Sequence, residues 1–138
     1  MTAPRPETLR VARRWIAKAE EDLAAAERLL SLDDSLAAVV CFHSQQAVEK
    51  LLKAPLVLAG VPFARTHDLI QLVRMLPCDL APTIPLAELA ALNRYAVEAR
   101  YPISDEPITG EEARAAIAVS RRMRTTALQA VGPASSRD

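Results

Sequence analysis

Hydrophobic positions near the N-terminus recur at alternating steps of three and four residues, which is the period of an amphipathic α-helix. The repeat starts at Leu9, ends at Leu30 and includes Ala12, Ile16, Ala19, Leu23 and Ala26. Pro6, Glu7 and Thr8 stand where such a helix would begin. Charged residues occupy the other face, so we predict a first helix that packs on one side only.

A second helix is predicted after a short interruption. Asp33 or Asp34 can accept hydrogen bonds from the free backbone N–H groups at its start. Gly60 suits a left-handed cap at its other end. Pro55 lies inside this run and lacks a backbone N–H, so we expect a kink near Leu51 or an early end.

A short third helix is predicted between Thr66, a plausible N-cap, and Pro77, which stops it, with Asp68 in its first turn. A fourth helix is predicted from about Pro85 to Arg100. Its inward positions are Leu89, Leu92, Ala96 and Ala99.

A fifth helix begins at Glu111 and Glu112, where acidic side chains suit the helix dipole. Ile117, Met123 and Ala127 lie on one side of it. Short connections between amphipathic helices make antiparallel neighbours, so we predict an all-α, antiparallel up-and-down bundle of four to five helices. The bundle should span residues 1–132 as one domain, with residues 133–138 as a disordered tail.

Composition supports this fold class and narrows the set of partners. Hydrophobic residues make up 51% of the chain but aromatic residues only 4%, so the apolar mass favours helices over strands. The formal net charge is +0, so no global field draws the protein to nucleic acid or to an anionic membrane. The arginines of the fifth helix form the only concentrated basic group, and a solvated surface is favoured there over an RNA site.

The two cysteines indicate a reducing compartment. Cys41 and Cys78 lie outside any CxxC or Cys/His ligand spacing, so we expect reduced thiols and no metal site. The N-terminus has no apolar signal core, and no apolar segment reaches the roughly 18 residues that a membrane span requires. We therefore expect a cytoplasmic protein without a membrane partner.

Polar and apolar residues are closely mixed in the run CFHSQQAVEKLLKA, residues 41–54. Gln46, Glu49, Lys50 and Lys53 stand three or four apart and predict one polar strip, with His43 a turn before it. Spacing alone favours a solvated face in which Glu49 pairs with Lys53. Such an exposed ion pair contributes only ~0.3–0.5 kcal/mol to stability. The alternative is a surface that contacts a nucleotide or a partner chain.

Two further clusters carry candidate chemistry. Arg65, His67 and Asp68 surround the start of the third helix, where simple capping is favoured over anion binding or proton transfer. Asn93 and Arg100 lie seven apart and share a helix face, with Tyr101 directly after them. Tyr95 and Tyr101 stand directly after Arg94 and Arg100. No Gly-rich phosphate loop and no nucleophile or metal constellation stands out.

Three ordered motifs carry a family resemblance. FHSQQAVEKLLKA, then THDL, then LNRYAVEARYP resemble the HEPN domain, and the match covers roughly residues 10 to 130. The resemblance implies a helical bundle that is usually a homodimer and is often encoded beside a small nucleotidyltransferase in a toxin–antitoxin pair. It also implies that the polar strip of the second helix faces a groove open to a nucleotide or the partner.

The sequence departs from the family in one motif. Many HEPN proteins are metal-independent ribonucleases that carry an Arg, a short polar spacer and a His. After Arg100 comes YPISDEP, and neither His of this chain follows it. We therefore expect a non-catalytic module that binds a small nucleotidyltransferase and a nucleotide such as ATP. RNA is not the favoured partner. With such a partner enzyme, Tyr95 or Tyr101 is a candidate target for nucleotidyl transfer.

The predicted nucleotide and partner surface comprises Gln46, Glu49, Lys50, Lys53, His67, Asp68, Asn93, Arg100 and Tyr101. The alternative is a ribonuclease toxin with a rearranged site, in which Arg100 acts with His67 or His43. A third interpretation makes the domain a dimerisation scaffold that binds no nucleotide.

Overall fold

The computed structural model describes residues 3–63, 65–98, 101 and 105–132. In these residues, helices and the connections between them make up the whole fold. Its α-helices are α1 (Pro6–Leu32), α2 (Ala37–Leu58), α3 (Leu69–Met75), α4 (Leu86–Glu98) and α5 (Gly110–Val131). Two single 3₁₀ turns, η1 (Asp34–Leu36) and η2 (Cys78–Leu80), stand in the connections. The prediction of an all-α bundle of four to five helices is confirmed.

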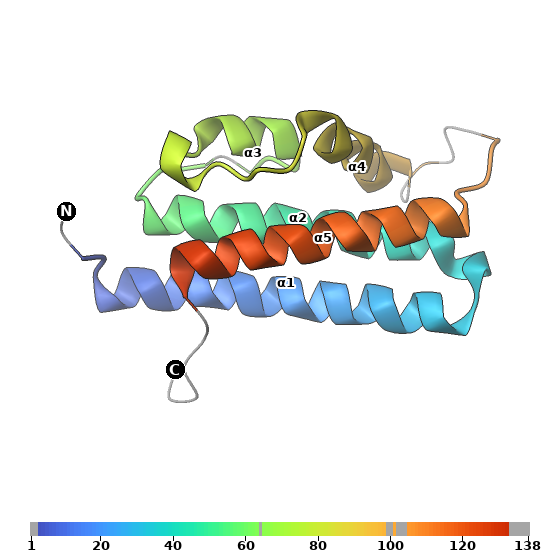
Figure 1. Cartoon of the computed structure of the whole chain (residues 1–138), viewed down its shortest axis with the longest axis horizontal. Coiled ribbons are helices and arrows are strands. Elements are labelled where there is room, and N and C mark those ends of the chain that lie inside the picture. Colours follow the sequence, from blue (N-terminus) through green and yellow to red (C-terminus); the bar gives the residue numbers. More distant parts are fainter. Residues whose placement is uncertain (1–2, 64, 99–100, 102–104, 133–138) are drawn as a thin grey trace.

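The helices form an up-and-down bundle around α2 (Figure 1). α2 packs against α1, α3, α4 and α5, so the most apolar helix is central. α1 lies along one side of α2 and α5, whereas α3 and α4 cover another side. None of the helices in the described ranges is long and apolar enough to cross a membrane.

The predicted stripe of α1 faces the core. Ala12, Ala19 and Ala26 are buried, and they repeat every seven residues. Ile16 and Leu23 are buried between them. Because alanine side chains are small, they let α1 approach α2 closely, while the larger residues fill the spaces between the helices. The regular step of three and four therefore identified this face correctly.

The connection between α1 and α2 differs from the prediction. Asp33 accepts a hydrogen bond from the Ser35 backbone N–H at 3.0 Å and caps η1, so α2 begins only at Ala37. The Asp34 carboxylate lies instead against Gly110, at the start of α5, where a Cβ on Gly110 would overlap it. Only a residue without a side chain fits beside this carboxylate unless Asp34 moves.

Pro55 does not end α2 early, because the helix continues to Leu58. The proline sits near the C-terminus of the helix and is buried in the core. Gly60 then adopts a φ of 71°, and the Val61 backbone N–H donates to the Leu56 carbonyl at 3.0 Å. This geometry is the left-handed glycine cap predicted from the sequence.

α3 is capped by Asp68 rather than by Thr66. The Asp68 Oδ1 atom accepts from the backbone N–H of Ile70 at 3.0 Å and from that of Gln71 at 3.4 Å. Thr66 does not bind a helical N–H group: its Oγ1 accepts a hydrogen bond from the backbone N–H of the capping residue Asp68, at 3.2 Å. A carboxylate at the last non-helical position reaches both free N–H groups, which the Thr66 hydroxyl does not.

α4 and α5 largely follow their predicted patterns. Leu89 and Leu92 are buried and Ala96 is half-buried, but Tyr95 is an inward residue that the pattern missed. Ile117, Met123 and Ala127 of α5 are buried as expected. Thr109 and Glu112 form a reciprocal capping box at its start. Ala99, Arg100 and the predicted tail 133–138 lie outside the described residues.

Candidate functional site

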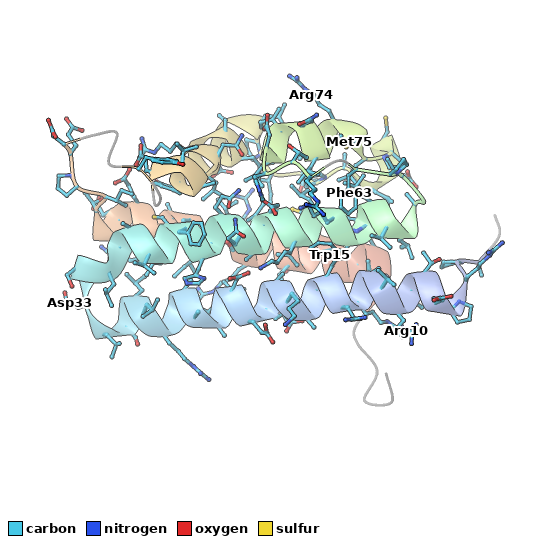
Figure 2. The ribbon with its side chains drawn as sticks, turned by 180° about the vertical axis from the view of Figure 1, so that it is seen from behind. Arg10, Trp15, Asp33, Phe63, Arg74 and Met75 are labelled. Atoms are coloured by element: carbon cyan, nitrogen blue, oxygen red, sulfur yellow. The ribbon has the colours of Figure 1, made fainter. Side chains whose placement is uncertain are left out.

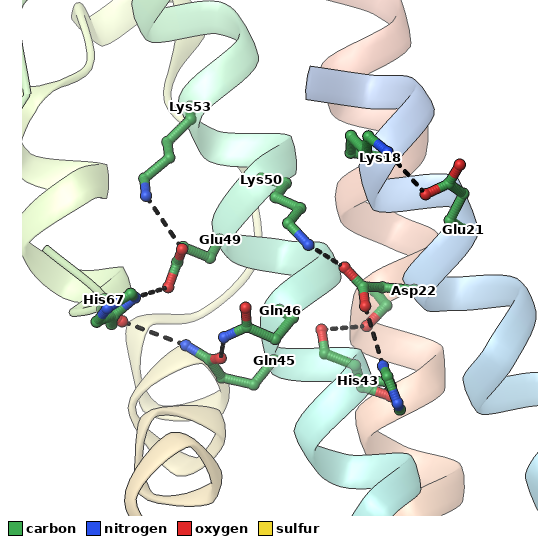
Figure 3. A network of polar contacts seen from close by, with 12 residues as sticks. Lys18, Glu21, Asp22, His43, Gln45, Gln46, Glu49, Lys50, Lys53 and His67 are labelled. Carbon is green, nitrogen blue, oxygen red and sulfur yellow. Dashed lines mark hydrogen bonds and ion pairs between the residues drawn. The ribbon is translucent and has the colours of Figure 1, made fainter. Parts of the chain in front are cut away.

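The polar residues of α2 do not form one strip on a single face. Glu49 and Lys53 are only 3% and 7% exposed, whereas Gln46 and Lys50 are half-buried. Figure 3 shows Glu49 and Lys53 directed toward His67, and Lys50 directed toward α1. The prediction of one continuous strip is therefore wrong, as is the interpretation of a solvated Glu49–Lys53 pair.

Glu49 is the centre of the first cluster. Its Oε2 lies 3.0 Å from Lys53 Nζ, and its Oε1 lies 2.8 Å from Nδ1 of His67, in the segment before α3. Both carboxylate oxygens thus have cationic or N–H partners inside the fold. This carboxylate joins α2 to the segment that leads into α3.

Lys53 is enclosed by aromatic rings as well as by Glu49. Its Nζ lies 5.3 Å from the ring centroid of Trp15 on α1 and 5.5 Å from that of Phe63. The two rings meet edge to face, with centroids 6.1 Å apart. Both residues are labelled in Figure 2. A cation at these distances from two ring faces gains cation–π attraction, so the structure holds Lys53 within the bundle.

His67 is the exposed member of the first cluster. Its side chain is 54% exposed although its Nδ1 is bound to buried Glu49. Because an ionised carboxylate only accepts hydrogen bonds, Nδ1 is the protonated nitrogen in this pairing. The other ring nitrogen, Nε2, is then free to accept a proton or a hydrogen bond from a bound molecule.

Gln45 supports His67 and was not among the predicted residues. Its side chain is fully buried, and its Nε2 donates to the His67 carbonyl at 3.2 Å. Its Oε1 accepts from Gln46 Nε2 at 2.8 Å. Gln45, Glu49 and Lys53 are spaced four apart, so the i, i+4 step contained a signal for the buried line.

Asp68 and Asn93 are brought together next to His67. Asn93 Nδ2 donates to Asp68 Oδ1 at 2.9 Å, and Asn93 Oδ1 accepts from the Leu69 N–H at 2.8 Å. Asn93 therefore ties α4 to the first turn of α3. The favoured interpretation of Asp68 as a cap is confirmed, and Asn93 completes that cap from a second helix.

His43 and Lys50 belong to a separate cluster around Asp22 of α1. His43 Nδ1 lies 2.9 Å from Asp22 Oδ1, and Lys50 donates to Asp22 Oδ2. Asp22 was not predicted, because its partners lie more than 20 residues away in the sequence. Figure 3 shows His43 and His67 on different sides of α2, so the structure does not bring the two histidines together.

Tyr95 and Cys41 form a buried polar contact between α4 and α2. Burial raises the pKa of the Cys41 thiol to about 11, although a hydrogen bond with Tyr95 opposes the shift. Burial likewise raises the pKa of Tyr95 to about 12, against a hydrogen bond from Arg94. Tyr95 is 5% exposed, whereas Tyr101 is 64% exposed, so of these two tyrosines Tyr101 is the accessible one.

The basic residues of α5 are neutralised by acidic partners. Arg121 and Arg124 pair with glutamates of α1, Arg122 pairs with Glu88 of α4, and Arg114 pairs with Asp34. Nucleic-acid binding depends on uncompensated cations that meet phosphates, and this group supplies none. No group of three or more His, Cys, Asp or Glu residues in the described ranges could hold a metal ion.

Comparison with known proteins finds one matching family model and similar solved structures. The model of the HEPN domain matches residues 12–130. The structure resembles that of TT1696 from Thermus thermophilus, with a TM-score of 0.74 and 28% identity over 86% of this chain and 97% of that chain. It also resembles ST0689, an archaeal HEPN homologue, with a TM-score of 0.66 and 26% identity over 87% and 97% of the two chains.

One named relative is similar over a shorter stretch. The protein called "Putative toxin MJ1304" from Methanocaldococcus jannaschii is 44% identical over 57 residues, which make up 41% of this chain. The matched stretch spans only 36% of that relative. The similarity therefore covers about a third of the relative's length.

Proposed function

This chain belongs to the HEPN domain family, and from that premise we propose that it is a dimeric, nucleotide-binding partner module for a small nucleotidyltransferase. The pair would act as a toxin–antitoxin-like system. Support comes from the order of the three sequence motifs and from the toxin name of the M. jannaschii relative.

The observation that carries the proposal is the exposed His67 ring supported by a buried carboxylate. Glu49 binds Nδ1, Gln45 binds the His67 carbonyl, and the capped start of α3 follows directly. Arg65 is exposed two residues earlier. An exposed imidazole and an exposed guanidinium two residues apart in the sequence both suit the oxygens of a nucleotide phosphate, since both groups are hydrogen-bond donors when charged.

The positions of the two histidines argue against the usual ribonuclease site of the family. His43 and His67 are each bound to a carboxylate, Asp22 and Glu49 respectively, on different sides of α2. Neither stands after Arg100 in the sequence, where the family motif has its base. A binding role for His67 needs no such Arg–His pair.

The proposal is tested first by native mass spectrometry of the tagged protein recovered from its own cells. We expect a complex that contains the chain together with a nucleotidyltransferase. ATP binding is then measured by calorimetry with that complex. His67→Ala should weaken ATP binding about tenfold, a loss of about 1.4 kcal/mol, whereas His43→Ala should leave it unchanged. Absence of the enzyme from the recovered complex contradicts the proposal.

A ribonuclease toxin with a rearranged site is the second candidate, and the contact between Glu49 and His67 Nδ1 is the observation that favours it. A histidine whose Nδ1 is held by a carboxylate presents Nε2 as a general base. In this alternative, His67 would act with Arg100. Purified protein would then cleave RNA in the presence of a metal chelator, and His67→Ala and Arg100→Ala would each abolish cleavage. RNA that stays intact with the wild-type protein rejects this alternative.

A further inference from the structure

An open groove separates α4 from α5. Its volume is about 420 Å³, and its lining is mostly small and apolar. The residues that line its floor are Ala91, Leu92, Ala115, Ala116, Ala118 and Val119. Ala91, Ala115 and Ala118 are exposed, so the backbones of both helices are accessible to another helix. Small side chains at such positions permit close helix packing.

Two ion pairs bridge the groove, one toward each end. Glu88 of α4 pairs with Arg122 of α5 at 2.9 Å, and Arg94 of α4 pairs with Glu112 of α5. These side chains remain between 31% and 51% exposed, so each can accept a further partner from outside. The groove therefore has an apolar floor and a charged rim.

The signs of the four rim charges alternate around the groove. One end carries a negative charge on α4 and a positive charge on α5, and the other end carries the reverse. A twofold axis between two facing copies lies in the plane of their contact. If the axis runs along the helices, Glu88 faces Arg122 of the other copy. If it runs across them, Glu88 faces Arg94 of the other copy.

Both twofold arrangements thus place opposite charges against each other, at both ends of the groove. A rim of one sign would repel its own copy, whereas this rim is neutral and complementary to itself. Isologous interfaces require this self-complementarity. We propose that the α4–α5 groove is the surface on which a second copy of this chain docks. The inference rests on the dimer in the proposed function and assigns its contact surface.

The first test fills the groove. Ala118→Arg places a long charged side chain at its exposed floor, and Ala17→Arg makes the same change at an exposed alanine of α1. Light scattering and sedimentation of the full chain over the micromolar range measure dimerisation. We expect a dimer for the wild type and for Ala17→Arg, and a dimer Kd raised about tenfold or more for Ala118→Arg.

The second test uses the rim charges. Glu88→Arg should weaken the dimer, because it places like charges together in either arrangement. Glu21→Arg makes the same change at an exposed glutamate of α1 and should leave the dimer as stable as the wild type. The double change Glu88→Arg with Arg122→Glu restores the pair within each copy. In this double variant the rim charges of α4 are both positive and those of α5 are both negative. Recovery of the dimer therefore supports contact of α4 with α5 of the second copy. A dimer that stays weak supports contact of α4 with α4.

The two proposals fail in different ways. A wild-type dimer that is unaffected by both Ala118→Arg and Glu88→Arg overturns the assignment of this groove but leaves the dimer intact. A wild-type monomer that still binds the nucleotidyltransferase overturns the inference and the dimer of the proposed function, but leaves its partner role standing. Variants that remain dimeric but lose the nucleotidyltransferase show that the groove receives that enzyme, which also overturns the inference.

Discussion

Lys53 and Glu49 form an ion pair one helical turn apart on α2, yet their side chains are only 8% and 4% exposed. On a solvated helix such a pair contributes only ~0.3–0.5 kcal/mol. Here the pair lies between the Trp15 and Phe63 rings and His67, where a charge that loses its partner stays away from water. The contribution of this pair to stability therefore depends on its burial rather than on its spacing in the helix.

Glu49→Gln should therefore destabilise the protein strongly. The change leaves the buried Lys53 ammonium without a counter-charge, and removal of one partner from a buried pair costs about 3 kcal/mol or more. Glu21→Gln is the matched control, because Glu21 pairs with Lys18 on the surface of α1. Urea unfolding measures both changes. Equal losses in the two variants would show that the Glu49 environment is not buried.

Gly110 and Asp34 should be energetically coupled. A Cβ on Gly110 displaces the exposed Asp34 carboxylate from the start of α5 and from Arg114, so Gly110→Ala should be less favourable in the wild-type protein than in an Asp34→Ala variant. An Asp34→Ala background removes the three atoms that the Cβ would meet first, and the higher helix propensity of alanine should then stabilise the helix by up to about 1 kcal/mol. A double-mutant cycle in thermal or urea unfolding measures the coupling, and additive effects would contradict it.

The two thiols should differ in reactivity. Cys78 is exposed, whereas Cys41 is fully buried and its pKa is raised to about 11 by that burial. Since the thiolate is the reactive form, a disulfide reagent at neutral pH should modify Cys78 rapidly and Cys41 only after unfolding. The Cys78→Ser variant should then show no rapid reaction. Fast labelling of that variant would mean that the core opens around Cys41.

Stability should fall at alkaline pH, partly through Cys41. The folded state raises the thiol pKa from 9.0 to about 11 and so favours the neutral form. The resulting stabilisation is complete below pH 9 and is lost as the pH rises through the folded value of about 11. Cys41→Ala should flatten this part of the profile of unfolding free energy against pH. An unchanged slope would assign the alkaline loss to other groups, of which Tyr95 is the nearest.

If the partner enzyme transfers a nucleotidyl group to this chain, Tyr101 rather than Tyr95 should receive it. The Tyr101 hydroxyl would attack the α-phosphorus of a nucleoside triphosphate, with loss of its proton and release of pyrophosphate. Tyr101 is accessible, whereas Tyr95 is 5% exposed and engaged with Arg94 and Glu112. Peptide mass spectrometry should find the adduct in wild-type and Tyr95→Phe protein and lose it in Tyr101→Phe. An adduct on Tyr95 would contradict the buried placement.

The sequence by itself determined the helices and most of their inward faces. The three-and-four step of α1, the glycine cap after α2 and the acidic start of α5 depend on neighbours within a few residues, so local rules suffice for them. The same rules favoured capping at the cluster that contains Asp68 but placed the N-cap itself at Thr66, which fits the same pattern two residues earlier.

Only the tertiary structure decided which polar side chains of α2 are buried. Neighbouring residues of a helix point about 100° apart, so Gln45 rather than Gln46 joins Glu49 and Lys53 in the interior. That choice depends on Trp15, Phe63 and His67, which local spacing does not relate to α2. The groove between α4 and α5 likewise exists only once the two helices are placed side by side, because its four rim charges come from separate parts of the chain.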